Sequence, residues 1–504
     1  MKSKILDFDT LQKRINNYQK NNKKVVMCYG VFGTLHIGHI RYLKKAEQYG
    51  DVVIVVITPD NHENKAIKEH LESMRAEALA HLGWIDSVAV NVYADFQEMI
   101  SVLKPDVFAR GFESVHVSDN VNQEVQEEQF FQNIGIQYVI AKEDSFYTAE
   151  QINRYLSNFS ENVLNYIHLF KQRYTKDDLL RSLEQLQRLK VLVIGDTILD
   201  EYHFCSAIGK SSKDPTLALK HEHQDIFAGG ILAVANHVAN FAGHVDLVTV
   251  LGEKNSYEEF ILSQLKSNIR PFYIFKPNAP TLIKKRFIDG YSTNKLLEIY
   301  VMDDSYLDSE EDQELCNLVH EQLPLCDLVI VADYGHGTLN RNMIDLLTKK
   351  APFLAVNTQS NAGNRGFNTI SKYPRADFVS LAEHEIRLEK RDMVGRLFPM
   401  MAELAHNMSC RYFVVTRGKR GCILTDKQGG LFQVPSFAQK VVDRVGAGDA
   451  FFVMTSLFSV LGVPGEILGF IGNVAGSLAV EIMGNKKSID KLSVTEYINS
   501  LFQF

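Results

Sequence analysis

Two glycine-bearing turns, one near each end of the chain, carry the residues best suited to chemistry on phosphates. The first reads G-V-F-G-T-L-H-I-G-H over 30–39 and follows a hydrophobic run. The second reads R-V-G-A-G-D over 444–449 and precedes an apolar stretch. Each pattern predicts a strand, a turn and a helix, which together aim backbone N–H groups and the helix dipole at an anion. One turn holds two histidines and the other a carboxylate, so two different reactions on phosphates are expected.

The histidines of the first turn suit attack on a nucleotide phosphate. Gly30 lets the backbone approach the nucleotide, and Gly38 leaves room beside His36 and His39. Both imidazoles could donate hydrogen bonds to phosphoryl oxygens as charge builds up in an in-line displacement. No protein nucleophile is then required, because positioning, electrostatics and a divalent metal carry the rate. The alternative is that both histidines are solvated or metal-binding residues of a helix.

The carboxylate of the second turn suits phosphoryl transfer to a hydroxyl group. The consecutive amides of Gly446, Ala447 and Gly448 could hold the oxygens of a γ-phosphate during transfer. Asp449 then stands where it could accept the proton of an attacking hydroxyl. The alternative is that this tetrapeptide only begins a helix.

Length and composition favour a globular protein of several domains. The 504 residues suit two or three domains, and 45% hydrophobic with 23% charged residues is a globular composition. The net charge of -7 gives no basis for nonspecific nucleic-acid binding. No apolar helix reaches the roughly 20 residues of a membrane span. Six scattered cysteines and a start without an apolar leader favour a reducing cytoplasm.

Two α/β series and a helical segment are predicted to position the turns. From Lys24 to about Ile140, β-branched runs alternate with helical spacing, which indicates a doubly wound unit over 22–150. Residues 151–188 contain no glycine or proline and are predicted to be helices that link two domains. A second series fills 189–504. Within it, the alternating stretches 202–225 and 281–301 predict a small sheet projecting from the main one.

The first turn resembles the signature of the cytidylyltransferase-like nucleotidyltransferases, roughly G-x-F-D-x-x-H-x-G-H, and the resemblance covers about residues 22–155. It implies a Rossmann-like domain whose nucleotide contacts include the following residues: Gly30, Phe32, His36, Gly38, His39 and Arg75. Gly33 stands where the family has aspartate.

The late motif of that family is degraded here to S-F-Y-T-A-E-Q-I over 145–152. Thr148 is expected to cap a helix that faces the triphosphate, and Arg154 is a candidate for the terminal arginine of the motif. Lys65 or Lys68 is a candidate for a phosphate contact.

From Lys190 onward the chain resembles the ribokinase-like carbohydrate kinases, with motifs in order and at similar spacing. The resemblance implies a lid sheet and Asp449 as the base. It implies an acceptor site made of these residues: Asp196, Asp200, Gly229, Gly230, Asn236, Lys284 and Arg286. It also implies a nucleotide site made of these: Thr416, Gly418, Gly421, Gly446, Ala447, Gly448 and Asn473.

Three segments depart from the kinase pattern. The lysine of the D-Y-x-K-G motif is His336, and the D-P-K strand end is N-T-Q over 357–359. Of the P-N-x-x-E motif, which organises Mg²⁺ and its waters in the family, Glu385 remains. The amide-rich segment N-T-Q-S-N-A-G-N-R-G-F-N over 357–368 is either a redesigned nucleotide or substrate loop or a polar surface loop.

The two halves together resemble the bifunctional heptose 7-phosphate kinase/heptose 1-phosphate adenylyltransferase family, in which the kinase comes first. This resemblance implies a cytoplasmic enzyme that uses ATP and Mg²⁺ to phosphorylate a sugar or polyol. Its N-terminal domain would transfer a nucleoside monophosphate from ATP or CTP to a sugar or polyol phosphate. Ribokinase-like proteins dimerise through the lid, which implies a homodimer here. The second hypothesis is that only one domain is catalytic and that the other binds nucleotide as a sensor or scaffold.

Overall fold

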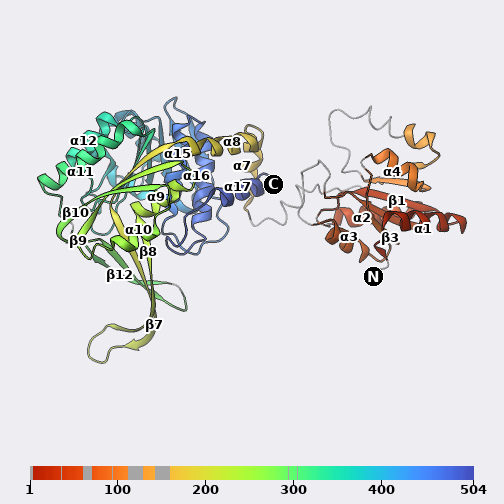
Figure 1. Ribbon diagram of the computed structural model, residues 1–504, viewed down its shortest axis with the longest axis horizontal. Coiled ribbons are helices and arrows are strands. Elements are labelled where there is room, and N and C mark those ends of the chain that lie inside the picture. Colours follow the sequence, from red (N-terminus) through yellow and green to blue (C-terminus); the bar gives the residue numbers. More distant parts are fainter. Residues whose placement is uncertain are drawn as a thin grey trace. The chain divides into compact units, whose positions relative to one another are not determined.

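The computed structural model describes residues 4–33, 35, 37–60, 71–93, 95–111, 129–141, 159–292, 294–303 and 305–504. The chain forms two compact units, Met1–Ser157 and Asn158–Phe504 (Figure 1). No helix in these described ranges combines the length and apolar character needed to cross a membrane.

A five-stranded parallel sheet forms the first unit, in the order β3-β2-β1-β4-β5. The strands are β1 (Val25–Gly30), β2 (Val52–Ile57), β3 (Ser87–Val90), β4 (Val107–Gly111) and β5 (Gln137–Ala141). β2 reads V-V-I-V-V-I and is buried throughout, because both faces of the sheet are covered.

Helices cover both faces of this sheet. α1 (Phe8–Lys20) and α4 (Phe96–Leu103) share one apolar cluster, and α2 (Ile37–Ala46) and α3 (Glu72–Ala80) share the other. α1 begins at Asp7, whose side chain accepts a hydrogen bond from the Thr10 amide. The predicted doubly wound α/β fold is confirmed. The helix α2 starts at the carboxyl end of the central strand β1, which is where the first glycine turn lies.

The second unit contains a nine-stranded sheet in the order β10-β9-β6-β13-β14-β15-β16-β17-β18. The strands are β6 (Lys190–Gly195), β9 (His244–Lys254), β10 (Ile269–Pro280), β13 (Leu328–Asp333), β14 (Leu354–Thr358), β15 (Phe378–Ala382), β16 (Tyr412–Thr416), β17 (Cys422–Asp426) and β18 (Leu431–Val434). The strands from β10 to β16 are parallel, and β17 and β18 complete one edge as antiparallel strands.

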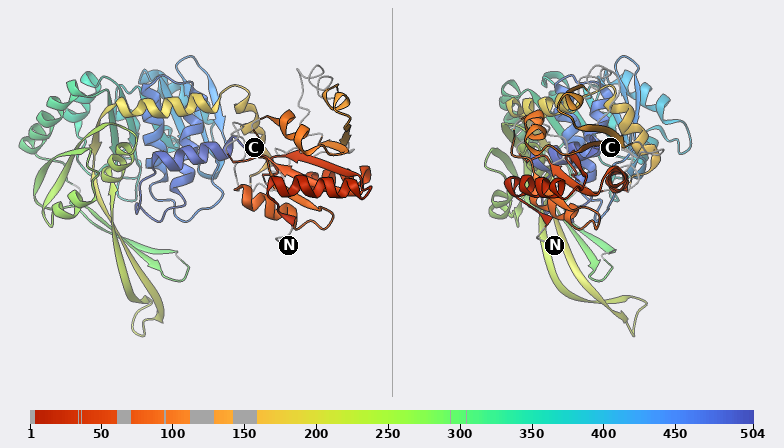
Figure 2. Two further views of the ribbon diagram at one scale, coloured as in Figure 1. Left: turned by 45° about the vertical axis from the view of Figure 1, so that its right-hand side comes forward. Right: turned by 90° about the vertical axis from the view of Figure 1, so that its right-hand side faces the viewer.

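Two helical layers enclose this sheet (Figure 2). One layer comprises α7 (Glu161–Lys171), α8 (Lys176–Gln185), α9 (Ile231–Ala239), α10 (Glu258–Gln264), α15 (Ala447–Val460), α16 (Gly465–Ala479) and α17 (Lys491–Leu501). The other comprises α11 (Ser309–Gln322), α12 (Arg341–Lys350), α13 (Glu383–Lys390) and α14 (Leu397–Asn407). Both α15 and α16 are mostly apolar around their circumference, because other helices as well as the sheet cover them.

The helices α7 and α8 correct the predicted domain boundaries. Residues 151–188 were expected to form a linker, yet the described part of this segment packs into the core of the second unit. Phe170 is fully buried and stacks on Phe470 of α16 with ring centroids 4.2 Å apart. Arg173 forms an ion pair with Glu466 of the same helix at 2.8 Å. A single boundary after Ser157 replaces the expected ones at 150 and 188, because the apolar face of these helices is covered by a partner distant in sequence.

A four-stranded sheet projects from the second unit, as the alternating stretches predicted (Figures 1 and 2). This sheet, here called the lid, has the order β12-β11-β7-β8. Its strands are β7 (Thr197–Lys210), β8 (Leu217–Gly230), β11 (Ile283–Asp289) and β12 (Lys295–Val301). β7 continues directly from the region after β6, so the lid starts beside the carboxyl ends of the main strands.

Candidate active sites

The segment 444–449, here called the phosphate turn, leads into α15. Gly446 has a φ of 80°, and a Cβ at this position would lie 2.4 Å from Asn485 Oδ1. Only glycine fits these two constraints without strain. A Cβ at Gly448 would meet no atom within 4 Å, so the space beside its amide is open. This geometry suits an anion at the helix N-terminus, and the phosphate contacts of Gly446, Ala447 and Gly448 stay a prediction.

Asp449 lies in the first turn of α15 and is half-buried. Tyr334 Oη donates a hydrogen bond of 2.9 Å to Asp449 Oδ1. Burial raises the pKa of Asp449 to about 6, while the hydrogen bond from Tyr334 and the positive charge of Lys284 lower it and Asp200 raises it. A carboxylate with such a pKa is ionised at neutral pH and is well matched to general-base work.

The lid brings three of the predicted acceptor residues together: Asp200, Gly229 and Arg286. Arg286 on β11 pairs with Asp200 on β7 and donates to Glu298 at 3.0 Å. Asn485 also donates to Asp200 at 3.1 Å, and a Cβ at Gly229 would lie 2.2 Å from the Asp200 carboxylate. The carboxylate of Asp200 is therefore already paired with a cation of the protein.

Lys284 is buried on the same lid strand. Its side chain lies over the ring of Tyr300 with the ammonium 5.2 Å from the centroid, and burial lowers its pKa. Lys284 makes no ion pair with any residue that the structure describes. A buried cation of this kind favours a negatively charged or electron-rich partner.

Asp196 follows β6 and organises the chain after β13. Its carboxylate accepts hydrogen bonds from the amides of Tyr334, His336 and Thr338 at 3.1, 3.3 and 3.2 Å. Gly230 lies at the start of α9 with a φ of 53°, and the Asp196 carbonyl accepts from the following Ile231 amide. Asp196 also borders a pocket that His336, Lys276 and Thr281 line. An acceptor contact for Asp196 stays a prediction, beside this structural role.

The side chain of Asn236 forms hydrogen bonds with the segment before β10. Its Nδ2 donates to the Gln264 carbonyl at 3.0 Å, and its Oδ1 accepts from the Lys266 amide at 3.2 Å. Both groups thus tie α9 to the segment before β10. Asn236 also lines a pocket that Ala228 and Asn485 border, and its sugar contact stays a prediction.

The residues of the predicted nucleotide side lie around β16 and β17. Thr416 ends β16 and donates to the Leu381 carbonyl at 3.4 Å. Gly418 and Gly421 have φ values of 55° and 76°, and a Cβ at Gly421 would lie 2.0 Å from the Val434 carbonyl oxygen. Asn473 is buried, and its Nδ2 donates to the Gly469 carbonyl at 2.8 Å and contacts Cys422 Sγ at 3.3 Å. The donor group of Asn473 is therefore used inside the fold.

Glu385 is the one predicted metal-associated residue. Its two oxygens accept hydrogen bonds from the Ala382 amide at 2.7 Å and the Ser360 amide at 3.0 Å. Burial raises the pKa of Glu385 to about 7, against the effect of these hydrogen bonds. Among the described residues, no group of three His, Cys, Asp or Glu side chains could hold a metal ion. The residues do not suit a metal held by a cage of protein ligands. They fit a Mg²⁺ that arrives with the nucleotide phosphates and keeps its waters.

In the first unit, the described part of the first glycine turn, 30–39, packs its neighbouring residues against Phe32. Phe32 is buried with a φ of 47°, and its ring lies 5.1 Å from that of His39 on α2. A Cβ at Gly30 would lie 3.2 Å from the Phe32 ring, and Gly38 lies in the first turn of α2. The predicted contacts of His36, Lys65, Lys68, Thr148 and Arg154 fall outside the described residues.

Arg75 on α3 joins the ends of two strands instead of facing an open space. Its guanidinium donates to the carbonyls of Val31 at 2.5 Å and Thr58 at 2.8 Å and pairs with Asp60 at 3.0 Å. Only 4% of Arg75 is exposed. This arrangement gives Arg75 a structural role, and the predicted phosphate contact would require it to release one of these partners.

The segment 357–368, here called the amide loop, supplies functional contacts that sequence reasoning missed. Asn361 and Asn364 each donate to the Tyr334 carbonyl at 2.8 Å, and Asn368 donates to the Asp333 carbonyl at 2.9 Å. These three asparagines hold the backbone after β13, while other residues of the loop are exposed, with Phe367 at 90%. A nucleotide or substrate contact of the loop stays a prediction. The A-D-Y-G motif marked Tyr334 in the sequence, but no local pattern shows which distant amides hold it.

A second missed feature connects the lid to the phosphate turn through Asp443. Lys295 of β12 pairs with Asp443 at 3.0 Å, and the hydroxyl of Tyr202 on β7 donates to it at 2.8 Å. The amides of Arg444 and Val445 also donate to Asp443, at 2.7 and 3.3 Å. One carboxylate thus holds both the lid and the start of the phosphate turn.

The α/β sheet, the projecting lid and the carboxylate at the start of α15 define a carbohydrate-kinase architecture. Residues 188–492 match the model of the pfkB family carbohydrate kinases, and the chain belongs to this family. Residues 27–176 match the cytidylyltransferase-like family model, which lies ahead of the kinase region in the sequence.

Curated relatives carry the name Bifunctional protein HldE. The protein of Rhodopseudomonas palustris strain BisA53 is 25% identical over 313 residues, 61% of this chain and 62% of that protein. The protein of Chromohalobacter salexigens is 26% identical over 329 residues, 64% of this chain and 65% of that protein. The matched region thus spans less than two thirds of these relatives. Phosphofructokinase-2 from Escherichia coli, solved with potassium, has the fold of the second unit, with a TM-score of 0.51 and 17% identity over 62% of this chain and 99% of that one.

Proposed function

We propose that the protein is a bifunctional enzyme of sugar activation. Its kinase phosphorylates a sugar or polyol with ATP, and its N-terminal domain transfers a nucleoside monophosphate from ATP or CTP to a sugar or polyol phosphate. The observation that carries the proposal is the environment of Asp449, the last residue of the phosphate turn. Its carboxylate accepts a hydrogen bond from Tyr334, and the positive charge of Lys284 on the lid lowers its pKa. The relatives named Bifunctional protein HldE support two activities in one chain. The resemblance to the bifunctional heptose kinase/adenylyltransferases favours a role in making activated sugars for lipopolysaccharide or capsule.

In the kinase reaction, Asp449 accepts the proton of the acceptor hydroxyl as its oxygen bonds to the γ-phosphorus. The bond from that phosphorus to the bridging oxygen of ADP breaks. The amides at the end of the phosphate turn stabilise the transferring group, and Lys284 with the Asp200–Arg286 pair orients the acceptor. Bound Mg²⁺ supplies charge neutralisation of the phosphates, and Glu385 would assist it through water.

In the transferase reaction, an acceptor phosphate oxygen attacks the α-phosphorus of the nucleotide and pyrophosphate leaves. His39, with His36, donates hydrogen bonds to the phosphoryl oxygens as charge develops. Gly30 and the segment around Phe32 allow the nucleotide to approach the end of β1.

A second candidate is that only the kinase is catalytic and the first unit binds nucleotide as a sensor or scaffold. Two observations favour it: Gly33 stands where an aspartate is expected, and the guanidinium of Arg75 is taken up by Val31, Thr58 and Asp60.

Purified protein with Mg²⁺ would be assayed for ATP-dependent phosphorylation and for pyrophosphate release across a panel of sugars and sugar phosphates. Asp449→Asn should abolish the first activity alone, and His39→Ala the second alone. If Asp449→Asn abolishes phosphorylation and neither the wild type nor any variant releases pyrophosphate, the first unit is a nucleotide-binding sensor or scaffold. Absence of both activities in the wild type overturns the proposal. Nucleotide binding is followed separately as a rise in Tm.

We also propose a cytoplasmic homodimer that forms through the lid. Exposed apolar residues lie on the lid: Leu297 and Ile299 of β12 are 46% and 47% exposed, and Ile208 and Leu217 of the β7–β8 hairpin are 70% and 56% exposed. Such a face favours a partner of the same kind. Light scattering at micromolar concentration should give the dimer mass, and Ile299→Glu should give the monomer. A monomeric wild type contradicts this assembly.

A further inference from the structure

The residues 333–338, here called the mid-sheet turn, lead from β13 toward the acceptor site. Asp196 holds this turn by its amides, since it accepts from Tyr334, His336 and Thr338. Gly335 takes a φ of 71°, which is a conformation that glycine adopts readily. The amide side of the turn is thus fixed by one buried carboxylate of the neighbouring strand.

The amide loop holds the carbonyl side of the same turn. Asn361 and Asn364 converge on one acceptor, the Tyr334 carbonyl, each at 2.8 Å. A Cβ at Gly335 would lie 2.3 Å from Asn364 Nδ2, so the loop closes directly over the turn.

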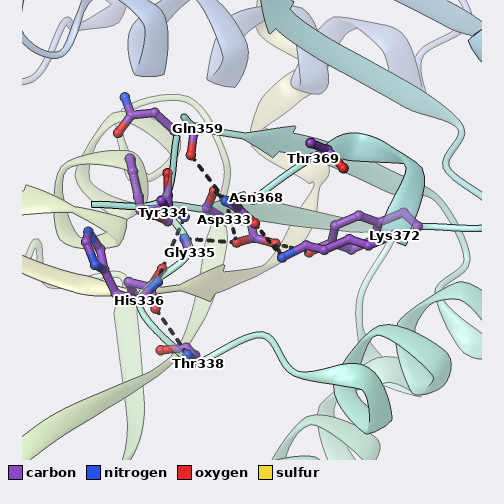
Figure 3. Close-up of polar contacts among 12 residues, drawn as sticks. Asp333, Tyr334, Gly335, His336, Thr338, Gln359, Asn368, Thr369 and Lys372 are labelled. Carbon is purple, nitrogen blue, oxygen red and sulfur yellow. Dashed lines mark hydrogen bonds and ion pairs between the residues drawn. The ribbon is translucent and has the colours of Figure 1, made fainter. Parts of the chain in front are cut away.

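Asp333 anchors the base of this assembly (Figure 3). Lys372 pairs with Asp333 at 2.5 Å, and Asn368 donates to both the carbonyl and the carboxylate of Asp333. These contacts fix the turn on both sides, which leaves the backbone of Tyr334 little freedom.

The side chain of Tyr334 leaves this clamped backbone and reaches Asp449. Its hydroxyl donates to Oδ1 at 2.9 Å, while Asp449 Oδ2 forms no hydrogen bond with any described residue. The terminal torsion of an aspartate is broad, so an unrestrained carboxylate would rotate between orientations. The hydrogen bond selects one of them.

We propose that Tyr334 is a positioning residue for the kinase base, fixing one oxygen of Asp449 so that the other receives the proton of the acceptor hydroxyl. The amide loop serves this contact by holding Tyr334. The inference rests on the proposed kinase function. Besides the hydrogen bond from the neutral Tyr334, the charged groups that act on Asp449 are Asp200 of β7, Lys284 of β11 and Glu385 of α13.

Tyr334→Phe tests the contact because it removes only the hydroxyl group. A hydrogen bond to a charged group stabilises by about 1.5–3 kcal/mol, which corresponds to roughly a 10- to 100-fold fall in kcat with KM nearly unchanged. The acid limb of the pH profile should move up by about one to two pH units, since the ionised form loses a donor. Tyr412→Phe is the matched control, because its hydroxyl donates at 2.8 Å to the Val463 carbonyl instead of a carboxylate. Equal effects of the two variants overturn the proposal.

A measurement without turnover separates this proposal from the kinase function. In protein labelled with [4-¹³C]aspartate, the Asp449 carboxyl signal is assigned by its loss in Asp449→Asn. Its titration midpoint should be higher in Tyr334→Phe than in the wild type, whether or not any acceptor is phosphorylated. An unchanged midpoint refutes the positioning role, while absence of phosphorylation in the wild type refutes only the kinase proposal. If Tyr334→Phe does not fold, Asn361→Ala/Asn364→Ala should shift the same midpoint by a smaller amount, and no shift is again a refutation.

Discussion

Replacing Lys295 by methionine is expected to loosen the lid from the phosphate turn. In the structure, Lys295 of β12 pairs with Asp443 at 3.0 Å, and Asp443 accepts from the amides that begin the phosphate turn. Methionine keeps the apolar stem of the side chain and removes the charge. The lid strands and the amides of the phosphate turn would then move more independently of each other.

The expected size of the effect follows from the exposure of the pair. The Lys295 side chain is 33% exposed and that of Asp443 is 9% exposed, so the ion pair is partly screened by solvent. A charge-assisted hydrogen bond of this kind contributes about 1 kcal/mol after screening, well below a fully buried pair. Such a loss weakens the equilibrium constant for the contact between lid and phosphate turn by roughly fivefold.

Lys285→Met is the matched control. Lys285 pairs with Glu201 at 3.1 Å with nearly the same exposures, 32% and 6%, but both residues belong to the lid. Kinase kcat/KM would be measured for both variants with ATP and with the acceptor, together with Tm and the mass by light scattering. Lys295→Met should lower kcat/KM about fivefold for both substrates, while Lys285→Met should change Tm alone. Equal losses of kcat/KM in the two variants, or a wild-type kcat/KM in Lys295→Met, would refute the link between lid and phosphate turn.

Three further predictions concern pH and the buried turn. Kinase kcat/KM should fall as the pH drops below about 6, because the pKa of Asp449 is raised to about 6 and the base must be ionised; a level profile down to pH 4.5 would contradict this role. Burial lowers the pKa of His237 to about 4, so the unfolded state binds the extra proton below pH 6.5. The free energy of unfolding should therefore fall by about 3 kcal/mol as the pH drops from 6.5 to 4. Urea titrations at several pH values should show that the unfolding free energy of His237→Gln depends less steeply on pH. Gly335→Ala should lower the free energy of unfolding by about 2 kcal/mol, because of its left-handed φ and the nearby Asn364, and should also lower kcat. An unchanged Tm in thermal unfolding would contradict this, because it would mean that Asn364 moves aside at little energetic cost.

The sequence predicted the elements whose signal is local. β-branched runs such as V-V-I-V-V-I marked the buried strands, and the alternation over 281–301 marked the lid strands β11 and β12. The phosphate turn was recognisable because its glycines, its carboxylate and the following apolar helix are contiguous. Asp200, Lys284 and Arg286 were found through motifs that belong to adjacent lid strands.

The contacts that the sequence did not predict join segments far apart in the chain. Asn236 has the residue type of a ligand contact, but only the docking of α9 against 264–266 determines where its amide points. The glycine-poor composition of 151–188 predicted helices correctly, yet it could not show that Phe170 meets Phe470. The amide loop was ambiguous for the same reason, since its partner Tyr334 lies in the turn that follows β13.

The stacking of Phe170 on Phe470 also affects how the protein folds while it is being synthesised. The two rings come from positions 170 and 470, so the ribosome, adding about 5–20 residues per second, makes the second about 15–60 s after the first. All five strands of the first unit have left the ribosome long before that time, whereas α7 still lacks the helix that covers it. We expect the nascent chain to carry a completed N-terminal domain and an unfinished kinase for most of its synthesis.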